Sequence, residues 1–170
     1  MKRFSVIVSI IILLCCCTRQ SAQLPSNKAT ISDEKMDMMT YNKMCIEAEM
    51  AEIGAYLDSS SVEFIKSDAG YWYKVVNSNK KTKVNDIVTI SGTVQVLGGT
   101  PCKELDSLTL RLGKRDHTKV LDLALANAHV GDEIWIISPS SLAYGIKGIS
   151  NCITSRTPVL YKIKVLKTNE

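Results

Sequence analysis

Apolar residues in the first third of the chain follow the period of a helix. Five of them recur at helical spacing: Met39, Ile46, Met50, Ile53 and Leu57. Ser32 and the two acidic residues after it form a typical helix start, because small polar caps and early carboxylates satisfy free backbone N–H groups. We therefore expect a helix over residues 32–58. Its methionine-rich stripe either binds peptides, since thioethers adapt to many shapes, or packs on the rest of the chain or on a second copy.

Beyond residue 68 the apolar period shortens to that of strands. Alternating or continuous apolar residues mark five segments: 71–76, 87–96, 108–112, 134–137 and 159–165. One helical pattern interrupts them, with an apolar face made of Leu121, Ala124, Leu125 and Ala128. We expect an α+β domain over residues 68–168, in which an antiparallel sheet wraps around one helix and is preceded by the N-terminal stalk helix.

Residues 1–17 have the features of an export signal. Lys2 and Arg3 precede an apolar stretch over residues 6–14, which is too short to cross a bilayer, since a spanning helix needs about 20 apolar residues. The stretch ends in three cysteines, and Leu14 stands three positions before Cys17. This spacing resembles the cleavage motif of bacterial lipoproteins, with Cys17 as the lipidated residue and the two cysteines before it as alternatives.

A lipid on Cys17 would place the protein in the cell envelope. Several acyl chains on one cysteine hold a protein durably at a membrane, so we expect a lipid-anchored protein facing the periplasm. Either membrane leaflet is compatible with this anchor. Residues 18–31 are polar, contain Pro25 and are expected to form a flexible tether. The alternatives are an ordinary secretory signal cleaved near Ser21 and an uncleaved anchor.

Charge and cysteine spacing exclude two other classes of protein. Without Lys2 and Arg3 the chain has 21 − 2 = 19 basic and 17 acidic residues, a net charge of +2, and no basic stripe with interleaved aromatics. Nucleic acid is therefore not an expected partner. The six cysteines include no CxxC pair, and His117 and His129 lie far from any cysteine, so neither a metal site nor a cofactor is expected.

The most specific sequence signal lies between residues 130 and 145. Residues 130–133 read Val-Gly-Asp-Glu, an apolar strand follows, and residues 138–145 read Ser-Pro-Ser-Ser-Leu-Ala-Tyr-Gly. This order resembles the FKBP-type peptidyl-prolyl isomerases, which carry a similar turn, strand and Leu-Ala-Tyr-Gly segment. Further similarities lie in segments 86–88, 99–100 and 157–165. Together they cover residues 70–167, and the stalk helix followed by Gly-Tyr-Trp-Tyr is similar to FKBP-like lipoproteins of Bacteroidota-type bacteria.

The resemblance implies an FKBP-like fold and a shallow apolar bowl that binds a proline-containing peptide. Rotation about the X–Pro bond is opposed by the partial double bond of the amide, a barrier of about 20 kcal/mol. The barrier falls when the amide is twisted, desolvated and hydrogen-bonded in its twisted form. Such a site needs apolar walls, aromatic rings and one or two placed donors, and it needs no nucleophile.

The resemblance also assigns seven substrate-binding residues. Tyr144 matches the tyrosine whose hydroxyl bonds the ligand carbonyl, Tyr161 matches an aromatic of the pocket floor, and Ile153 matches an apolar residue of the rim loop. At four positions this chain lacks the family's aromatic residue: Leu121 stands for a tryptophan, Leu108 and Cys102 for phenylalanines, and Ile90 for a tyrosine.

Other departures lie around the same bowl. Lys103 replaces an aspartate, His117 and Thr118 replace two aliphatic residues before the helix, and Thr154-Ser155 replaces a proline pair. Trp135 could serve as a relocated pocket aromatic, but its position in a central strand favours packing in the core. The bowl is thus expected to be less aromatic than is typical of the family.

The resemblance places Cys102 at the pocket rim and Cys152 in the loop that folds over it. Exported proteins occupy compartments where disulfides persist, so we expect a bond between these two cysteines. On the chain-entropy estimate, closing a loop of about 50 residues stabilises the fold by about 4 kcal/mol.

Three functions follow from these expectations. The first is a membrane-tethered peptidyl-prolyl isomerase whose partners are proline-containing segments of exported proteins. The second is a binding module for peptides or proteins in envelope assembly, in which the same bowl no longer catalyses rotation; the missing aromatics and Lys103 favour it. The third is a structural scaffold, because fold alone does not fix function. Self-association through the stalk helix is possible in each case.

Overall fold

The computed structural model describes residues 37–78, 86–149 and 151–169. The chain divides into two units, Met1–Asp37 and Met38–Glu170, and the elements described below belong to the second. The signal peptide, the tether, the three adjacent cysteines and the predicted helix start at Ser32 lie outside the described residues.

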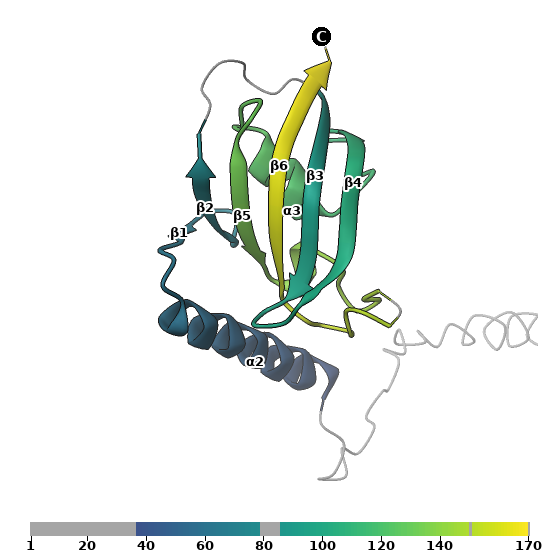
Figure 1. Cartoon of the computed structure of the whole chain (residues 1–170). Helices are drawn as coiled ribbons and strands as arrows, with labels where there is room; N and C mark the ends of the chain where they lie inside the picture. The colour runs from purple at the N-terminus through teal and green to yellow at the C-terminus, as the bar shows by residue number, and fades with distance from the viewer. Residues whose placement is uncertain (1–36, 79–85, 150, 170) are drawn as a thin grey trace, which may run out of the picture. The chain divides into compact units, whose positions relative to one another are not determined.

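One antiparallel sheet and two helices make up the described unit (Figure 1). In chain order the elements are α2 (Met38–Ser59), β1 (Ile65–Lys66), β2 (Trp72–Asn77), β3 (Ile87–Val96), β4 (Pro101–Arg111), α3 (Lys119–Leu125), β5 (Glu133–Ser138), the 3₁₀ turn η1 (Ser140–Leu142) and β6 (Val159–Asn169). The strand order is β1-β2-β5-β6-β3-β4. The expected α+β arrangement, a sheet around one helix with a further helix before it, is confirmed.

The main core lies between the sheet and α3, which Figure 1 shows behind the strands. Alternation along each strand sends every second side chain to this face. The residues that fill it include Val88, Ile90, Val94, Leu110, Val120, Leu121, Leu125, Ile134, Ile136, Tyr161, Ile163 and Val165. β3 spans the range predicted from its alternation, Ile87–Val96, and β5 is an inner strand, as its continuous apolar run indicates.

The opposite face of the sheet packs against α2. Ile53 is fully buried there, with Trp72, Ile137 and Leu160 around it, and Leu57 packs beside them. Trp135 also lies on this face, partly buried, with the Lys162 Nζ atom 4.4 Å from its ring centroid. It therefore belongs to the packing between helix and sheet and not to a pocket on the α3 side.

The predicted apolar stripe of α2 packs only at its C-terminal end. Met39, Ile46 and Met50 are exposed by 77%, 58% and 38%, whereas Glu49 is 8% exposed. The buried side follows a four-residue spacing through Glu49 and Ile53 that apolar periodicity alone does not reveal. In the described residues no helix has the length and apolar composition needed to span a membrane.

β4 is longer than its alternation predicts because it contains a β-bulge. Ile90 pairs with Leu108 and Gly92 pairs with Leu105, so the interval between these two pairs is three residues long in β4 and two residues long in β3. Ser107, inside the bulge, has a φ of 48°. The extra residue brings Leu105 and Leu108 to the same face, toward α3.

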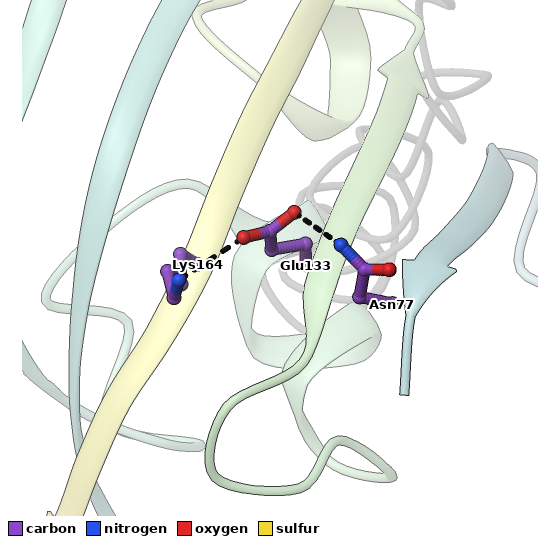
Figure 2. Close-up of polar contacts among 3 residues, drawn as sticks. All are labelled: Asn77, Glu133 and Lys164. Carbon is purple, nitrogen blue, oxygen red and sulfur yellow. Dashed lines mark hydrogen bonds and ion pairs between the residues drawn. The ribbon is translucent and has the colours of Figure 1, made fainter. Parts of the chain in front are cut away.

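A polar chain on the α2 face of the sheet links three neighbouring strands (Figure 2). Glu133 of β5 accepts hydrogen bonds from the Nδ2 atom of Asn77 at 2.8 Å and from the Nζ atom of Lys164 at 3.1 Å. The hydrogen bond from Lys164, followed by the one from Asn77, lowers the pKa of the Glu133 carboxyl. Because the three side chains are solvated, the chain reinforces strand register more than stability.

Candidate functional site

A depression of about 290 Å³ opens beside Tyr144 on the α3 side of the molecule. Four segments form it: β4, the loop that enters α3, α3 itself, and the turn after η1. Its lining residues are Lys103, Leu105, Leu108, Asp116, His117, Thr118, Leu121, Ala143 and Tyr144. The wall is therefore aliphatic, the rim carries charges of both signs, and one half-buried aromatic ring stands at its edge.

Tyr161 lies directly behind Tyr144 and is fully buried. The two rings are stacked, with centroids 6.3 Å apart and planes inclined by 23°. The Tyr161 hydroxyl donates to the Thr118 Oγ1 atom at 3.1 Å, which fixes its ring against the entry to α3. The inner tyrosine is thus a rigid support for the outer one.

Burial keeps both tyrosines protonated. Desolvation raises the pKa of Tyr161, and the neighbouring Tyr144 raises it further. Desolvation also raises the pKa of Tyr144. The Tyr144 hydroxyl is therefore a neutral hydrogen-bond donor at physiological pH, which suits a peptide carbonyl as the acceptor.

Lys103 places a positive charge over the outer ring. Its Nζ atom lies 5.6 Å from the Tyr144 ring centroid, within the range of a cation–π contact. The ammonium draws electron density from the ring and so favours donation by the phenolic hydroxyl. Lys103 was noted in the sequence as a departure from the family pattern, and the structure puts it at the rim of the depression.

The structure separates the seven predicted substrate-binding residues into three groups. Tyr144, Leu108 and Leu121 line the depression. Tyr161 supports it from behind, and Ile90 and Ile153, exposed by 0% and 2%, belong to the core around it. Cys102 is an exposed residue of β4 outside the lining.

Sequence reasoning missed Leu105, Asp116 and Ala143 as lining residues. Leu105 was hidden by the bulge, because its spacing of three from Leu108 breaks the alternation expected of a strand. Ala143 follows directly from the Leu-Ala-Tyr-Gly segment, in which it precedes Tyr144, and could have been included on that ground. Asp116 adjoins His117, which the resemblance had already placed before the helix.

Cys102 and Cys152 form the expected disulfide, with their Cα atoms 5.7 Å apart. The bond ties the start of β4 to the loop that follows Tyr144. The same loop is held by a bridge between Ile149 and Ile153 and by a hydrogen bond from the Arg156 N–H to the Gly145 carbonyl at 2.9 Å. One edge of the depression is therefore fixed covalently and by backbone contacts.

A larger hollow, about 430 Å³, lies elsewhere, between β2 and α3. Tyr71 and Tyr73 line it, but no part of the Leu-Ala-Tyr-Gly segment does. In the described residues no three histidine, cysteine or acidic side chains gather as metal ligands. The depression beside Tyr144 therefore remains the candidate site, and its residues can bind, desolvate and hydrogen-bond a peptide.

Comparison with known proteins gives the family. The family model described as FKBP-type peptidyl-prolyl cis-trans isomerase matches residues 78–166. A peptidyl-prolyl cis-trans isomerase from Pseudomonas syringae pv. tomato has a similar structure, with a TM-score of 0.64, 17% identity, and coverage of 76% of this chain and 96% of that one. The crystal structure of AtFKBP13 is also similar, with a TM-score of 0.59, 18% identity, and coverage of 64% and 100%.

None of the curated proteins matches the sequence. The two structural similarities establish the fold, and the family model matches more than half of the chain. The resemblance inferred from residues 130–145 is thereby confirmed. The chain belongs to the FKBP-type peptidyl-prolyl cis-trans isomerase family.

Proposed function

We propose that this protein is a membrane-tethered peptidyl-prolyl isomerase that acts on proline-containing segments of exported proteins. The observation that carries the proposal is the open depression in which Tyr144 stands beside an aliphatic wall. Family membership favours the isomerase over a structural scaffold.

The wall can take up a prolyl ring and remove water from its amide. Leu105, Leu108 and Leu121 present the apolar surface, and each Å² of apolar surface buried there contributes about 25 cal/mol to binding. An amide without its hydration shell loses part of the stabilisation of its planar, polar form. Burial of the ring therefore lowers the barrier as well as binding the substrate.

Tyr144 supplies a donor for a carbonyl of the bound peptide. Only an interaction that is stronger in the twisted amide than in the planar one accelerates rotation. A donor held by the stacked Tyr161 ring and polarised by Lys103 can keep its direction while the peptide rotates around it. No covalent bond to the protein is formed at any stage.

Removal of the Tyr144 hydroxyl is the direct test. In the full chain, solubilised in detergent, Tyr144→Phe should lower kcat/KM for Leu-Pro and Phe-Pro peptides about tenfold, the value of one hydrogen bond of roughly 1.4 kcal/mol. Tyr73→Phe, a matched change at a tyrosine outside the depression, should leave kcat/KM unchanged. Equal rates for wild type and Tyr144→Phe would remove Tyr144 from the mechanism.

The second candidate is a binding module that has lost catalysis. It is favoured by the aliphatic wall, which offers no aromatic ring beneath a prolyl side chain, and by the loss of the family's aspartate, whose place Lys103 takes. Peptide affinity in the depression without any rate above the uncatalysed one would establish this candidate in place of the isomerase.

The membrane tether is tested at the cysteines. In a bacterial host, Cys17→Ser should abolish incorporation of labelled fatty acid and release the protein from the membrane fraction, because only a thiol at the new N-terminus can carry the lipid. Cys15→Ser and Cys16→Ser are the matched controls and should keep the label. Labelling that survives Cys17→Ser but is lost in Cys16→Ser would move the anchor to Cys16.

A further inference from the structure

Glu49 of α2 is a buried carboxylate with partners far away in the sequence. It is 8% exposed. It accepts hydrogen bonds from the backbone N–H of Ser140 and, at 2.9 Å, from the Ser140 hydroxyl, across a separation of 91 residues. Among the described residues it forms no ion pair with a lysine or arginine. A buried carboxylate is costly unless it is hydrogen-bonded, so the two bonds to Ser140 hold α2 and η1 together.

Ser140 in turn fixes the backbone on both sides of Tyr144. Its carbonyl oxygen accepts the N–H of Ala143 at 2.9 Å and the N–H of Gly145 at 2.8 Å. These are the residues immediately before and after Tyr144. A shift of Ser140 therefore moves both peptide units that set the direction of the Tyr144 side chain.

A second contact connects α2 to the segment that carries Tyr144, this time through Arg156. The Arg156 N–H donates to the Gly145 carbonyl at 2.9 Å. The Arg156 guanidinium donates to the Asn42 Oδ1 atom at 2.7 Å and lies 5.5 Å from the ring centroid of Tyr41. Residues 41–49 of α2 thus hold both backbone partners of the segment that carries Tyr144.

Ile53 gives the helix the fixed position that these contacts need. It lies one turn beyond Glu49 and is fully buried against Trp72, Ile137 and Leu160. The packed end of α2 is the anchor, and polar side chains of the preceding turns contact Ser140 and Arg156, which hydrogen-bond the backbone of the segment that carries Tyr144.

We infer that Glu49 is a positioning residue for the isomerase site, acting through Ser140 on the direction of the Tyr144 hydroxyl. The inference rests on the proposed function and deepens it, since it makes α2 a working part of the site. Two bonds to a carboxylate hold the turn more firmly than neutral bonds would, which is the reason for a glutamate at this buried position.

The test replaces the carboxylate by an amide of equal length in the full chain. The backbone N–H and the hydroxyl of Ser140 donate to different oxygens of the Glu49 carboxylate. In Glu49→Gln one of these oxygens becomes an NH2 group and the charge is lost, so the pair of charge-assisted bonds is not preserved. We expect kcat/KM to fall about tenfold, mainly through kcat, because a charge-assisted bond is worth about 1.5 kcal/mol or more. Glu47→Gln, an exposed glutamate on the same helix, is the matched control and should leave kcat unchanged.

A double-variant cycle separates positioning from general support of the fold. If Glu49 acts through Tyr144, then Glu49→Gln should change kcat less than about twofold when Tyr144 is already phenylalanine. An equal loss in both backgrounds would overturn the inference. Should Glu49→Gln not fold, Ser140→Ala takes its place, because it removes the 2.9 Å bond and keeps the backbone N–H.

Hydrogen exchange gives a readout that does not depend on catalysis. Glu49→Gln should speed amide exchange at Ala143 and Gly145 at least tenfold, with no change at inner-strand amides such as that of Ile136. Unchanged exchange at both residues would overturn the inference. A wild-type chain without isomerase activity would instead remove the proposed function, and the exchange rates would still decide whether Glu49 positions the Tyr144 segment.

Discussion

Replacing Cys102 and Cys152 together by serine is expected to lower the free energy of unfolding by about 4 kcal/mol. The two residues are 50 positions apart, so their bond removes a large part of the conformational freedom of the unfolded chain. A loss of this size is a large fraction of the 5–15 kcal/mol that stabilises an ordinary domain. Urea unfolding of the full chain, followed by tryptophan fluorescence, measures it.

The free cysteine of α2 supplies the control for this experiment. Cys45→Ser changes a thiol to a hydroxyl at a half-buried position without opening any loop, and its effect should stay within about 1 kcal/mol. Reduction of the wild type by dithiothreitol should reproduce the loss seen in the double variant. A double variant as stable as the wild type would mean that the bond adds nothing to stability.

The fold was predictable because apolar and polar residues alternate along most of its strands. Along β3 the apolar residues alternate, and Val88, Ile90 and Val94 lie in the core beside α3 as this alternation predicts. Thr89 and Gln95, on the other side of the strand, are buried as well. Leu121 and Leu125 show the helical counterpart on α3. Tyr144 was predictable for a different reason, since the Leu-Ala-Tyr-Gly segment is specific enough to be recognised without any knowledge of its surroundings.

The parts that escaped prediction depend on contacts distant in the sequence. A glutamate in a helix normally faces solvent, and no neighbouring residue in the sequence indicates that Glu49 is buried. Its hydrogen-bond partner, Ser140, lies 91 residues later in the chain. Leu105 was concealed by a bulge, since one extra residue reverses which side chains face the core. Ile90 was predicted as a substrate-binding residue, but it is fully buried and its side chain ends within the core instead of at the surface of the depression.

The Gly92→Ala substitution is expected to destabilise the protein by about 4 kcal/mol or more. Gly92 lies in β3, where it pairs with Leu105 on one side and with Ile163 on the other. Its φ of 152° lies in a region that only glycine adopts readily. A Cβ atom here would stand 2.1 Å from the Lys162 carbonyl oxygen and 2.8 Å from the Ile163 Cα atom.

Those neighbours decide the size of the effect. Both belong to the backbone of β6, an inner strand paired on each side, so neither can move away without breaking ladder hydrogen bonds. A flexible side chain in the same place would turn aside at little cost. The overlap can be relieved only by separating β3 from β6, and this separation would open the core that supports Tyr161.

Substitutions at two further glycines separate the predicted loss of stability into backbone strain and steric overlap. Gly70 has a φ of 85° and open space where a Cβ would stand, so Gly70→Ala should show the conformational strain alone, about 1 kcal/mol. Gly54 lies in α2 with open space and an ordinary helical backbone, so Gly54→Ala should stabilise the protein by up to about 1 kcal/mol. Urea unfolding should therefore rank the variants as Gly54→Ala, wild type, Gly70→Ala and Gly92→Ala. If Gly92→Ala and Gly70→Ala have the same free energy of unfolding, the close approach of β3 and β6 does not limit stability, and backbone strain accounts for the whole effect.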